Sequence, residues 1–306
     1  KGHRVTVKKQ SLLAIILATS IISPAWAEFP QNWYSEGVRD MLGGKIVSTA
    51  IQADGALVLS AEFRSLSKLA ASSILAASQL NDGSLIIGSS QPGGIYQLNP
   101  GAKEPELLLE LEQGLVTALT HTKDDTIYAA TAPQATIYAG KGKNLKPIYK
   151  AEDAYIWDLL AVDNNVYFVT GKSGSFYELK GQEAKLLFRS EESNLRRLHH
   201  NKHWGMVLGG GSKGIVYQYK DNKTQAVLDT SFDEVTAITS NPQGDLFVAV
   251  NRAQPQKNQS KSAVFYISPD GRSELLFPLD TETAYSLALN DQGTLFIGTG
   301  NAGRVY

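Results

Sequence analysis

The chain has 306 residues, of which 42% are hydrophobic and 19% are charged. This composition is typical of a folded protein and excludes a disordered chain. The length suits either two average domains or one large all-β domain. The 29 basic and 30 acidic residues give a formal net charge of −1, which argues against a generally basic nucleic-acid binder. Cysteine is absent, so disulfides, a thiolate nucleophile and cysteine metal ligands are excluded.

The first 27 residues have the pattern of a secretory signal peptide. Residues 1–10 carry four cations and no acid, residues 11–23 are apolar, and Ala25-Trp26-Ala27 follows Pro24. The apolar stretch is short for a membrane span, although an N-terminal anchor is the alternative. We expect cleavage before Glu28 and a mature chain with no stable membrane span. An exported protein without cysteine fits a bacterial periplasm or the medium, because small secreted eukaryotic domains usually use disulfides.

A repeat of about 40 residues predicts the fold. Apolar strands that carry a tyrosine recur after turn residues, with the tyrosines at 96, 138, 177, 217, 266 and 306. Each is preceded by a second apolar strand such as 85–88 or 246–249, and two further β-like runs separate successive copies. Four short strands in about 40 residues form one blade of a β-propeller. The sequence therefore predicts an all-β propeller with six visible repeats of four-stranded blades.

The last repeat also shows a family resemblance. Gly293-Thr-Leu-Phe-Ile-Gly-Thr-Gly-Asn-Ala-Gly-Arg-Val-Tyr306 is similar to the strand–turn–strand hallmark of exported bacterial propellers of the WD40-, NHL- and YVTN-like group. The resemblance extends over residues 45–306 and implies a rigid exported scaffold, which in that group is often a binding platform and sometimes an enzyme. It does not specify a ligand, because unrelated functions share the propeller fold.

Three segments are expected: a signal peptide at 1–27, an N-terminal segment at 28–44 and the propeller at 45–306. Residues 33–42 are predicted to form a short helix. The sixth repeat stops at its third strand, and residues 56–62 could supply the missing strand and close the ring by pairing. The alternative is that the chain is truncated at its C-terminal end, with a seventh blade to follow.

No catalytic residue, metal ligand or cofactor is predicted. The four histidines outside the signal peptide show no zinc-ligand spacing, and no serine lies in a nucleophile elbow. The segment Gly209-Gly-Gly-Ser-Lys-Gly214 lies between two predicted strands rather than before a helix. We interpret it as a hairpin turn and not as a phosphate-binding loop.

The candidate site is the face of the propeller where each fourth strand leads to the next first strand. These loops carry acids in successive repeats, which are either solvated turn residues or a ring that attracts a cation, a metal or a basic partner. Aromatic residues at comparable places could stack on a sugar or an aromatic side chain. The acids are Glu112, Glu152, Asp153, Glu191, Glu192, Asp233, Glu234, Asp280 and Glu282. The residues expected to bind at this axial face are Tyr155, Trp157, Asp158, Asn194, Arg196, Asp233, Glu234 and Tyr285.

One repeat is longer than the others because of a hydrophilic insertion from Asn251 to Ser262. Its candidate binding residues are Asn251, Arg252, Lys257 and Lys261. Long loops of this kind either carry binding or are tolerated without a function.

Two functions of different classes follow. The first is an exported, non-catalytic scaffold that binds a protein, peptide or glycan through its axial face. The second is a metal-dependent propeller hydrolase or lactonase with an axial calcium ion, which needs several oxygen ligands on the first strands. Only Asp158 and Asn194 are suitable ligands there, so the sequence favours the scaffold.

Overall fold

The computed structural model describes residues 49–51, 56–59, 65–153, 155–300 and 303–306. The chain divides into two units, Lys1–Phe63 and Arg64–Tyr306. The described part of the first unit is an antiparallel hairpin of β1 (Thr49–Ile51) and β2 (Leu57–Leu59). The predicted signal peptide and the predicted helix at 33–42 lie outside the described residues. No helix in the part of the chain that the structure describes is long and apolar enough to cross a membrane.

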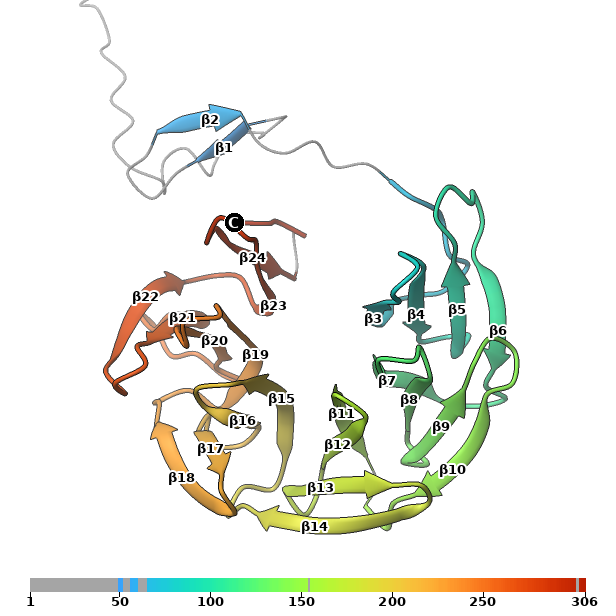
Figure 1. Ribbon diagram of the computed structural model, residues 1–306. Coiled ribbons are helices and arrows are strands. Elements are labelled where there is room, and N and C mark those ends of the chain that lie inside the picture. The colour runs from blue at the N-terminus through green and yellow to red at the C-terminus, as the bar shows by residue number, and fades with distance from the viewer. Residues whose placement is uncertain (1–48, 52–55, 60–64, 154, 301–302) are drawn as a thin grey trace, which may run out of the picture. The chain divides into compact units, whose positions relative to one another are not determined.

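The second unit is a β-propeller of antiparallel sheets in which the strands of each blade pair in chain order (Figure 1). The strands are β3 (Ile74–Gln79), β4 (Leu85–Ser89), β5 (Gly94–Leu98) and β6 (Glu106–Glu110) in blade 1; β7 (Leu115–His121), β8 (Ile127–Ala132), β9 (Thr136–Gly140) and β10 (Lys146–Lys150) in blade 2; β11 (Ile156–Val162), β12 (Asn165–Thr170), β13 (Ser175–Lys180) and β14 (Glu183–Arg189) in blade 3; β15 (Leu195–Asn201), β16 (Gly205–Gly210), β17 (Val216–Lys220) and β18 (Lys223–Leu228) in blade 4; β19 (Glu234–Ser240), β20 (Leu246–Asn251), β21 (Ser262–Ile267) and β22 (Ser273–Leu279) in blade 5; and β23 (Ala284–Leu289) with β24 (Leu295–Thr299) in blade 6.

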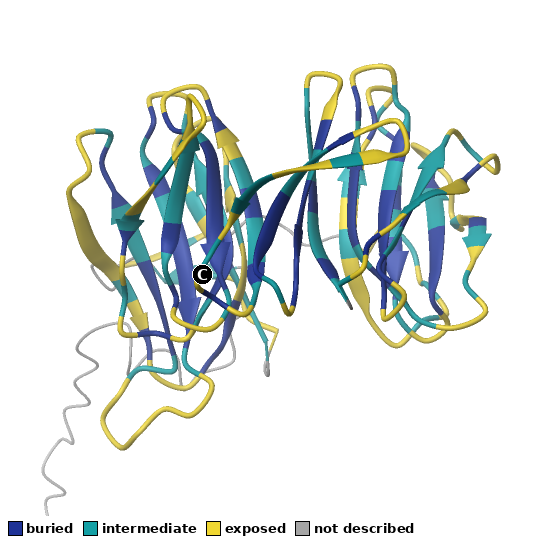
Figure 2. Cartoon of the chain, turned by 90° about the horizontal axis from the view of Figure 1, so that it is seen from below, coloured by how far each residue is buried: buried dark blue, intermediate teal, exposed yellow. Residues whose placement is uncertain are grey.

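Adjacent blades pack side by side, with their first strands innermost (Figure 1). The apolar second strands are buried between blades, as strands covered on both faces must be. One core cluster joins blades 2 and 3 through Ile137, Ile156 and Phe168, all fully buried. Figure 2 shows the buried residues concentrated on these inner strands, with the exposed residues at the loops and on the outer strands. The predicted fold class is confirmed.

The tyrosine register holds in five of the six blades. Tyr177 lies opposite Phe168, and the corresponding tyrosines of blades 1, 2 and 4 occupy the equivalent position. Tyr306 occupies it in blade 6 through backbone hydrogen bonds with Ile297. In blade 5 the position belongs to Phe265, and Tyr266 is displaced by one residue. Its side chain therefore points to the other sheet face, where its hydroxyl donates to Asp245 Oδ1 at 2.8 Å.

Blade 6 is incomplete among the described residues. Its sheet contains β23, β24 and a single bridge between Gly298 and Val305. The strand expected to complete it, at 56–62, contributes β2, which pairs with β1. Ring closure by the N-terminal strand therefore stays a prediction.

Every first strand carries a β-bulge at the same place. In each blade, the residue that follows the first or second paired position at the start of the strand has no partner on the second strand. A bulge turns the extra side chain out of the regular alternation, and bulges are frequent next to functional sites. The six bulge residues are Leu75, Thr117, Trp157, Arg196, Thr236 and Tyr285. They lie beside the loops that lead from each fourth strand to the next first strand, which is the face that sequence analysis selected.

Candidate binding site at the axial face

Three predicted residues form one continuous stack across blades 3 and 4. The rings of Tyr155 and Trp157 are stacked, with centroids 4.9 Å apart and planes inclined by 15°. The guanidinium carbon of Arg196 lies 4.0 Å from the Trp157 ring centroid. The indole N–H of Trp157 donates to Asn194 Oδ1 at 3.2 Å, which fixes the ring. We call Tyr155, Trp157 and Arg196 the ladder.

Glu234 extends the ladder to blade 5. Its Oε1 lies 2.9 Å from Arg196 Nη2, and both side chains are partly buried. Burial lowers the pKa of the Arg196 guanidinium, the attraction of Glu234 opposes that shift, and the neighbouring Arg197 adds to it. The Nε atom of Arg196 is buried and has no hydrogen-bond partner among the described residues. Arg196 therefore keeps hydrogen-bonding capacity that the described protein does not use.

Glycines make room for the ladder. A Cβ atom at Gly171 would lie 2.6 Å from Trp157 Nε1 and 2.8 Å from Asn194 Oδ1, and one at Gly211 would collide with the Arg196 side chain. The equivalent residue in blade 6 is Gly300, beside the ring of Tyr285. Blades whose bulge residue is smaller do not have glycine there. Thr117 is matched by Ala132, Thr236 by Asn251 and Leu75 by Ser90.

A second arginine–aromatic contact lies on blade 5. The guanidinium carbon of Arg252 is 3.9 Å from the Phe232 ring centroid, and its Nη2 donates to Ser231 Oγ at 2.9 Å. Asp233, predicted as a binding residue, instead holds the insertion through its Oδ2, which accepts the Ala253 N–H at 2.8 Å. Lys257 lies exposed in the insertion and Lys261 is half-buried at its end.

The loop acids are mostly used inside their own blades. Glu192 is only 2% exposed, and its Oε2 accepts the backbone N–H groups of Ser212 and Lys213 at 2.8 and 2.9 Å. Asp153 Oδ2 accepts the Ser173 hydroxyl at 2.5 Å, and Glu282 Oε2 accepts the Tyr306 hydroxyl at 2.7 Å. Glu192 and Asp153 thus fasten the loop between the second and third strands to the loop before the first strand, and Glu282 fastens the third-strand position of blade 6 to that loop. Such local roles support the interpretation of turn acids rather than a focused ring.

Asp158 follows the bulge, and its side chain makes contacts between strands rather than with the ladder. Its Oδ1 accepts the Leu159 N–H at 2.9 Å, and its Oδ2 accepts the Leu198 N–H of blade 4 at 2.8 Å. Burial raises the pKa of this carboxyl, and the nearby charge of Arg197 partly opposes the rise. Asp158 and Asn194, the two candidate calcium ligands, thus use their oxygens in bonds within the protein. No group of three or more histidine or acidic residues in the described ranges could hold a metal ion.

Tyr285 and the insertion lie apart from the ladder in their contacts. Tyr285 is 56% exposed, and its ring lies beside Gly300 of its own blade. Gly171, Gly211 and Arg197 were not among the site residues predicted from the sequence. Two of these could have been found by aligning the repeats, because each glycine matches a large residue at the bulge position. The Nη1 of Arg197 donates to the backbone oxygen of Arg196 at 3.0 Å, next to the ladder.

Comparisons with known proteins agree on the fold. No protein-family model and no curated protein matches the chain. Among solved structures, it is similar to a streptogramin B lyase, with a TM-score of 0.64 and 10% identity over 84% of each chain. It is also similar to virginiamycin B lyase from Staphylococcus aureus, with a TM-score of 0.62 and 11% identity over 76% of this chain and 83% of that one.

A third similar chain comes from a nidogen/laminin complex, with a TM-score of 0.55 and 12% identity over 71% of this chain and 85% of that one. All these identities are low, so the likeness identifies the architecture and not a function. The chain is a β-propeller protein.

Proposed function

We propose that this chain is an exported, non-catalytic β-propeller scaffold that binds a protein or peptide partner through its axial face. The observation that carries the proposal is the ladder of Tyr155, Trp157 and Arg196, which joins blades 3 and 4 beside the bulges. Tryptophan, tyrosine and arginine are the residue types enriched at the energetic centres of protein interfaces. One of the similar propellers comes from a protein–protein complex. Export rests on the signal-peptide pattern of residues 1–27.

The ladder favours a peptide over a glycan, the other partner expected from the sequence. Sugars typically need a free aromatic ring face, and the Trp157 ring already contacts both the Tyr155 ring and the Arg196 guanidinium. Arg196 instead offers charged N–H donors at a partly exposed ion pair with Glu234. A carboxylate of the partner could share these donors, because arginine binds carboxylates through paired hydrogen bonds.

The test is selection of a random phage-displayed peptide library on the full chain, followed by binding measurements with the Arg196→Gln variant. Peptides that bind the ladder should lose about tenfold in affinity, as expected for a lost charge-assisted hydrogen bond. Arg272→Gln is the matched control, because Arg272 is exposed and pairs with Asp270 in the loop before β22. Selected peptides that bind both variants equally would overturn the proposal, as would a glycan array that yields Arg196-dependent ligands when the peptide library yields none.

A further inference from the structure

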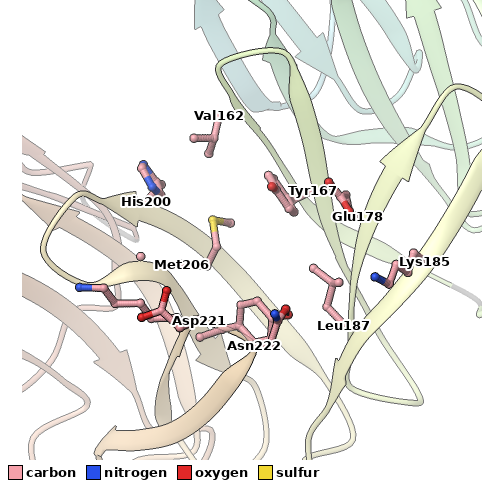
Figure 3. A pocket seen from close by; sticks show the side chains of 12 residues that line it. Val162, Tyr167, Glu178, Lys185, Leu187, His200, Met206, Asp221 and Asn222 are labelled. Atoms are coloured by element: carbon pink, nitrogen blue, oxygen red, sulfur yellow. The ribbon is translucent and has the colours of Figure 1, made fainter.

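A cavity of about 350 Å³ lies between blades 3 and 4 (Figure 3). It is lined by Val162 and His200 near the ends of the two first strands, at the ends farthest from the ladder. Its apolar lining comes from Val162, Leu187 and Met206, and its polar lining includes Glu178 and Lys185. We call it the blade 3–4 cavity. Its residues belong to strands and to the β17–β18 turn, so it is separate from the axial face.

The polar lining follows one row across blade 3. Tyr167 lies directly opposite Glu178, and Glu178 lies directly opposite Lys185. Residues paired in this way project from the same sheet face with Cβ atoms about 4.5–5.5 Å apart. Figure 3 shows Tyr167, Glu178 and Lys185 side by side along the blade 3 wall of the cavity.

The paired polar side chains of this row bond to each other in blade 4 but not in blade 3. In blade 4 the equivalent pair is Gln218 and Gln225, and Gln225 Nε2 donates to Gln218 Oε1 at 2.7 Å. In blade 3, Glu178 forms an ion pair of 3.3 Å with Lys180, whose side chain is 69% exposed. Lys185 has no ion pair or hydrogen bond with any described residue. The Lys180 side chain is largely in water, whereas the Glu178 side chain is only 14% exposed. Lys180 can therefore move away from Glu178 at little cost, which leaves Glu178 and Lys185 available to a ligand.

Two aromatic rings on the cavity wall are held in place from behind. Tyr167 and Tyr219 both pack against Phe176, with ring centroids 5.8 and 5.4 Å away, and Phe176 is fully buried. Burial raises the pKa of the Tyr167 phenol, and Glu178 adds to the rise. The Tyr167 hydroxyl therefore stays protonated and can donate a hydrogen bond, while its ring offers an apolar surface.

We propose that the blade 3–4 cavity binds a free α-amino acid with an apolar side chain. The α-ammonium group pairs with Glu178 and the α-carboxylate with Lys185, so the row supplies two opposite charges from directly paired positions of β13 and β14, and the ligand carries the complementary pair. The apolar side chain lies against Leu187, Met206 and the Tyr167 ring. A ligand without the carboxylate would leave Lys185 unpaired, and one without the ammonium group would leave Glu178 with Lys180 as its single ion-pair partner, and this difference gives the selectivity.

The experiment is isothermal titration calorimetry of the full chain with L-phenylalanine and L-leucine. Phenethylamine, which lacks the carboxylate, and 3-phenylpropionate, which lacks the ammonium group, are the ligand controls. Each should bind about tenfold more weakly than L-phenylalanine, the amount expected for one lost charge-assisted bond. The absence of binding by both amino acids at millimolar concentration would overturn the proposal, and so would equal binding of either control ligand.

The variants copy residues that blade 4 already carries. Glu178→Gln should weaken phenethylamine and L-phenylalanine but not 3-phenylpropionate, and Lys185→Gln should show the reverse preference between the two control ligands. The double variant rebuilds the glutamine pair of blade 4 and should remain folded, with L-phenylalanine binding lost. Lys146→Gln, at the equivalent position of blade 2, should bind normally. Binding of L-phenylalanine by the folded double variant at the wild-type level would contradict the assignment. The site is independent of the axial face, so Arg196→Gln should leave it unchanged.

Discussion

The guanidinium group of Arg196 covers the indole ring of Trp157, with 4.0 Å between the guanidinium carbon and the ring centroid. The two residues come from first strands of adjacent blades, and each is the bulge residue of its strand. Their contact therefore ties two blades together at the axial face. The Arg196 side chain stays 27% exposed. The contribution of the contact to stability can therefore be measured separately from the role in binding proposed for Arg196.

The first prediction is the coupling energy between Trp157 and Arg196, measured by a double-mutant cycle. Trp157→Ala should lower the free energy of unfolding by about 2–3 kcal/mol, somewhat less than for a fully buried aromatic residue. Combined with Arg196→Ala, it should show a coupling energy of about 0.5–2 kcal/mol, because a cation stacked on a partly desolvated indole is stabilised by that amount. Urea unfolding of the four proteins measures it. Arg272→Ala replaces Arg196→Ala in the control cycle, where the effects should add to within about 0.5 kcal/mol.

The second prediction concerns two adjacent glutamates with opposite surroundings. Glu192→Ala should destabilise the protein by about 2–4 kcal/mol, because it removes a buried carboxylate that accepts two backbone N–H groups of the β16–β17 loop. The side chain of Glu191 is 93% exposed, and its ion pair with Lys213 is long at 3.7 Å. Glu191→Ala should therefore change stability by less than about 0.5 kcal/mol. Denaturant unfolding compares the two, and equal effects would show that the loop does not depend on the Glu192 carboxylate.

The blade pattern was predictable because it depends on local rules. Apolar second strands, turn residues and a ring on the third strand recur with each blade, and the sequence shows all three. The slip at Phe265 was not predictable, since Tyr266 fits the spacing equally well and only pairing with β20 decides the register. Ring closure depends on long-range pairing of a short segment, which no local pattern specifies.

The site was only partly predictable for a related reason. Trp157 and Arg196 stood out as an aromatic and a cation beside the acidic loops at the axial face, and the structure joins them. Asp158 is the next residue after Trp157, but it bonds to strand backbone because the bulge breaks the alternation of side chains. The row of Tyr167, Glu178 and Lys185 resembles any half-exposed strand pattern. The cavity beside this row forms only where blade 4 packs against blade 3, so the sequence alone does not identify these residues as a site.

The third prediction concerns His199. Burial lowers the pKa of its imidazole from 6.5 to about 4, and the charge of His200 adds to this shift. A histidine with a depressed folded-state pKa contributes stability above its unfolded pKa, and that stability is lost as the pH falls toward the folded value. Wild type should therefore lose about 2 kcal/mol relative to His199→Gln between pH 7 and pH 5. The control is His203→Gln, which leaves His199 in place and should therefore keep the loss of stability that His199 causes. Urea unfolding at several pH values gives the difference, and a constant offset between wild type and His199→Gln would refute the buried neutral imidazole.

The last prediction concerns Asp158, whose carboxyl pKa is raised by burial. The resulting loss of stability occurs as the pH rises, whereas that of His199 occurs as the pH falls. For a carboxyl whose folded pKa lies above its unfolded value, the stabilising contribution is complete below the unfolded pKa and is lost as the pH rises through the folded pKa. Wild type should therefore become less stable relative to Asp158→Asn as the pH is raised from about 4, the usual aspartate pKa. Urea unfolding of both proteins across this range measures the trend.

Arg197 provides the check on its cause. The Arg197 charge opposes the rise in the Asp158 pKa, so Arg197→Gln should move the pH-dependent loss of stability to higher pH. If wild type instead gained stability over Asp158→Asn with rising pH, the attraction of Arg197 would outweigh the burial of the carboxylate. The main role of Asp158 would then be an ion pair with Arg197 that links blades 3 and 4. It would not be the acceptance of hydrogen bonds from the backbone N–H groups of Leu159 and Leu198.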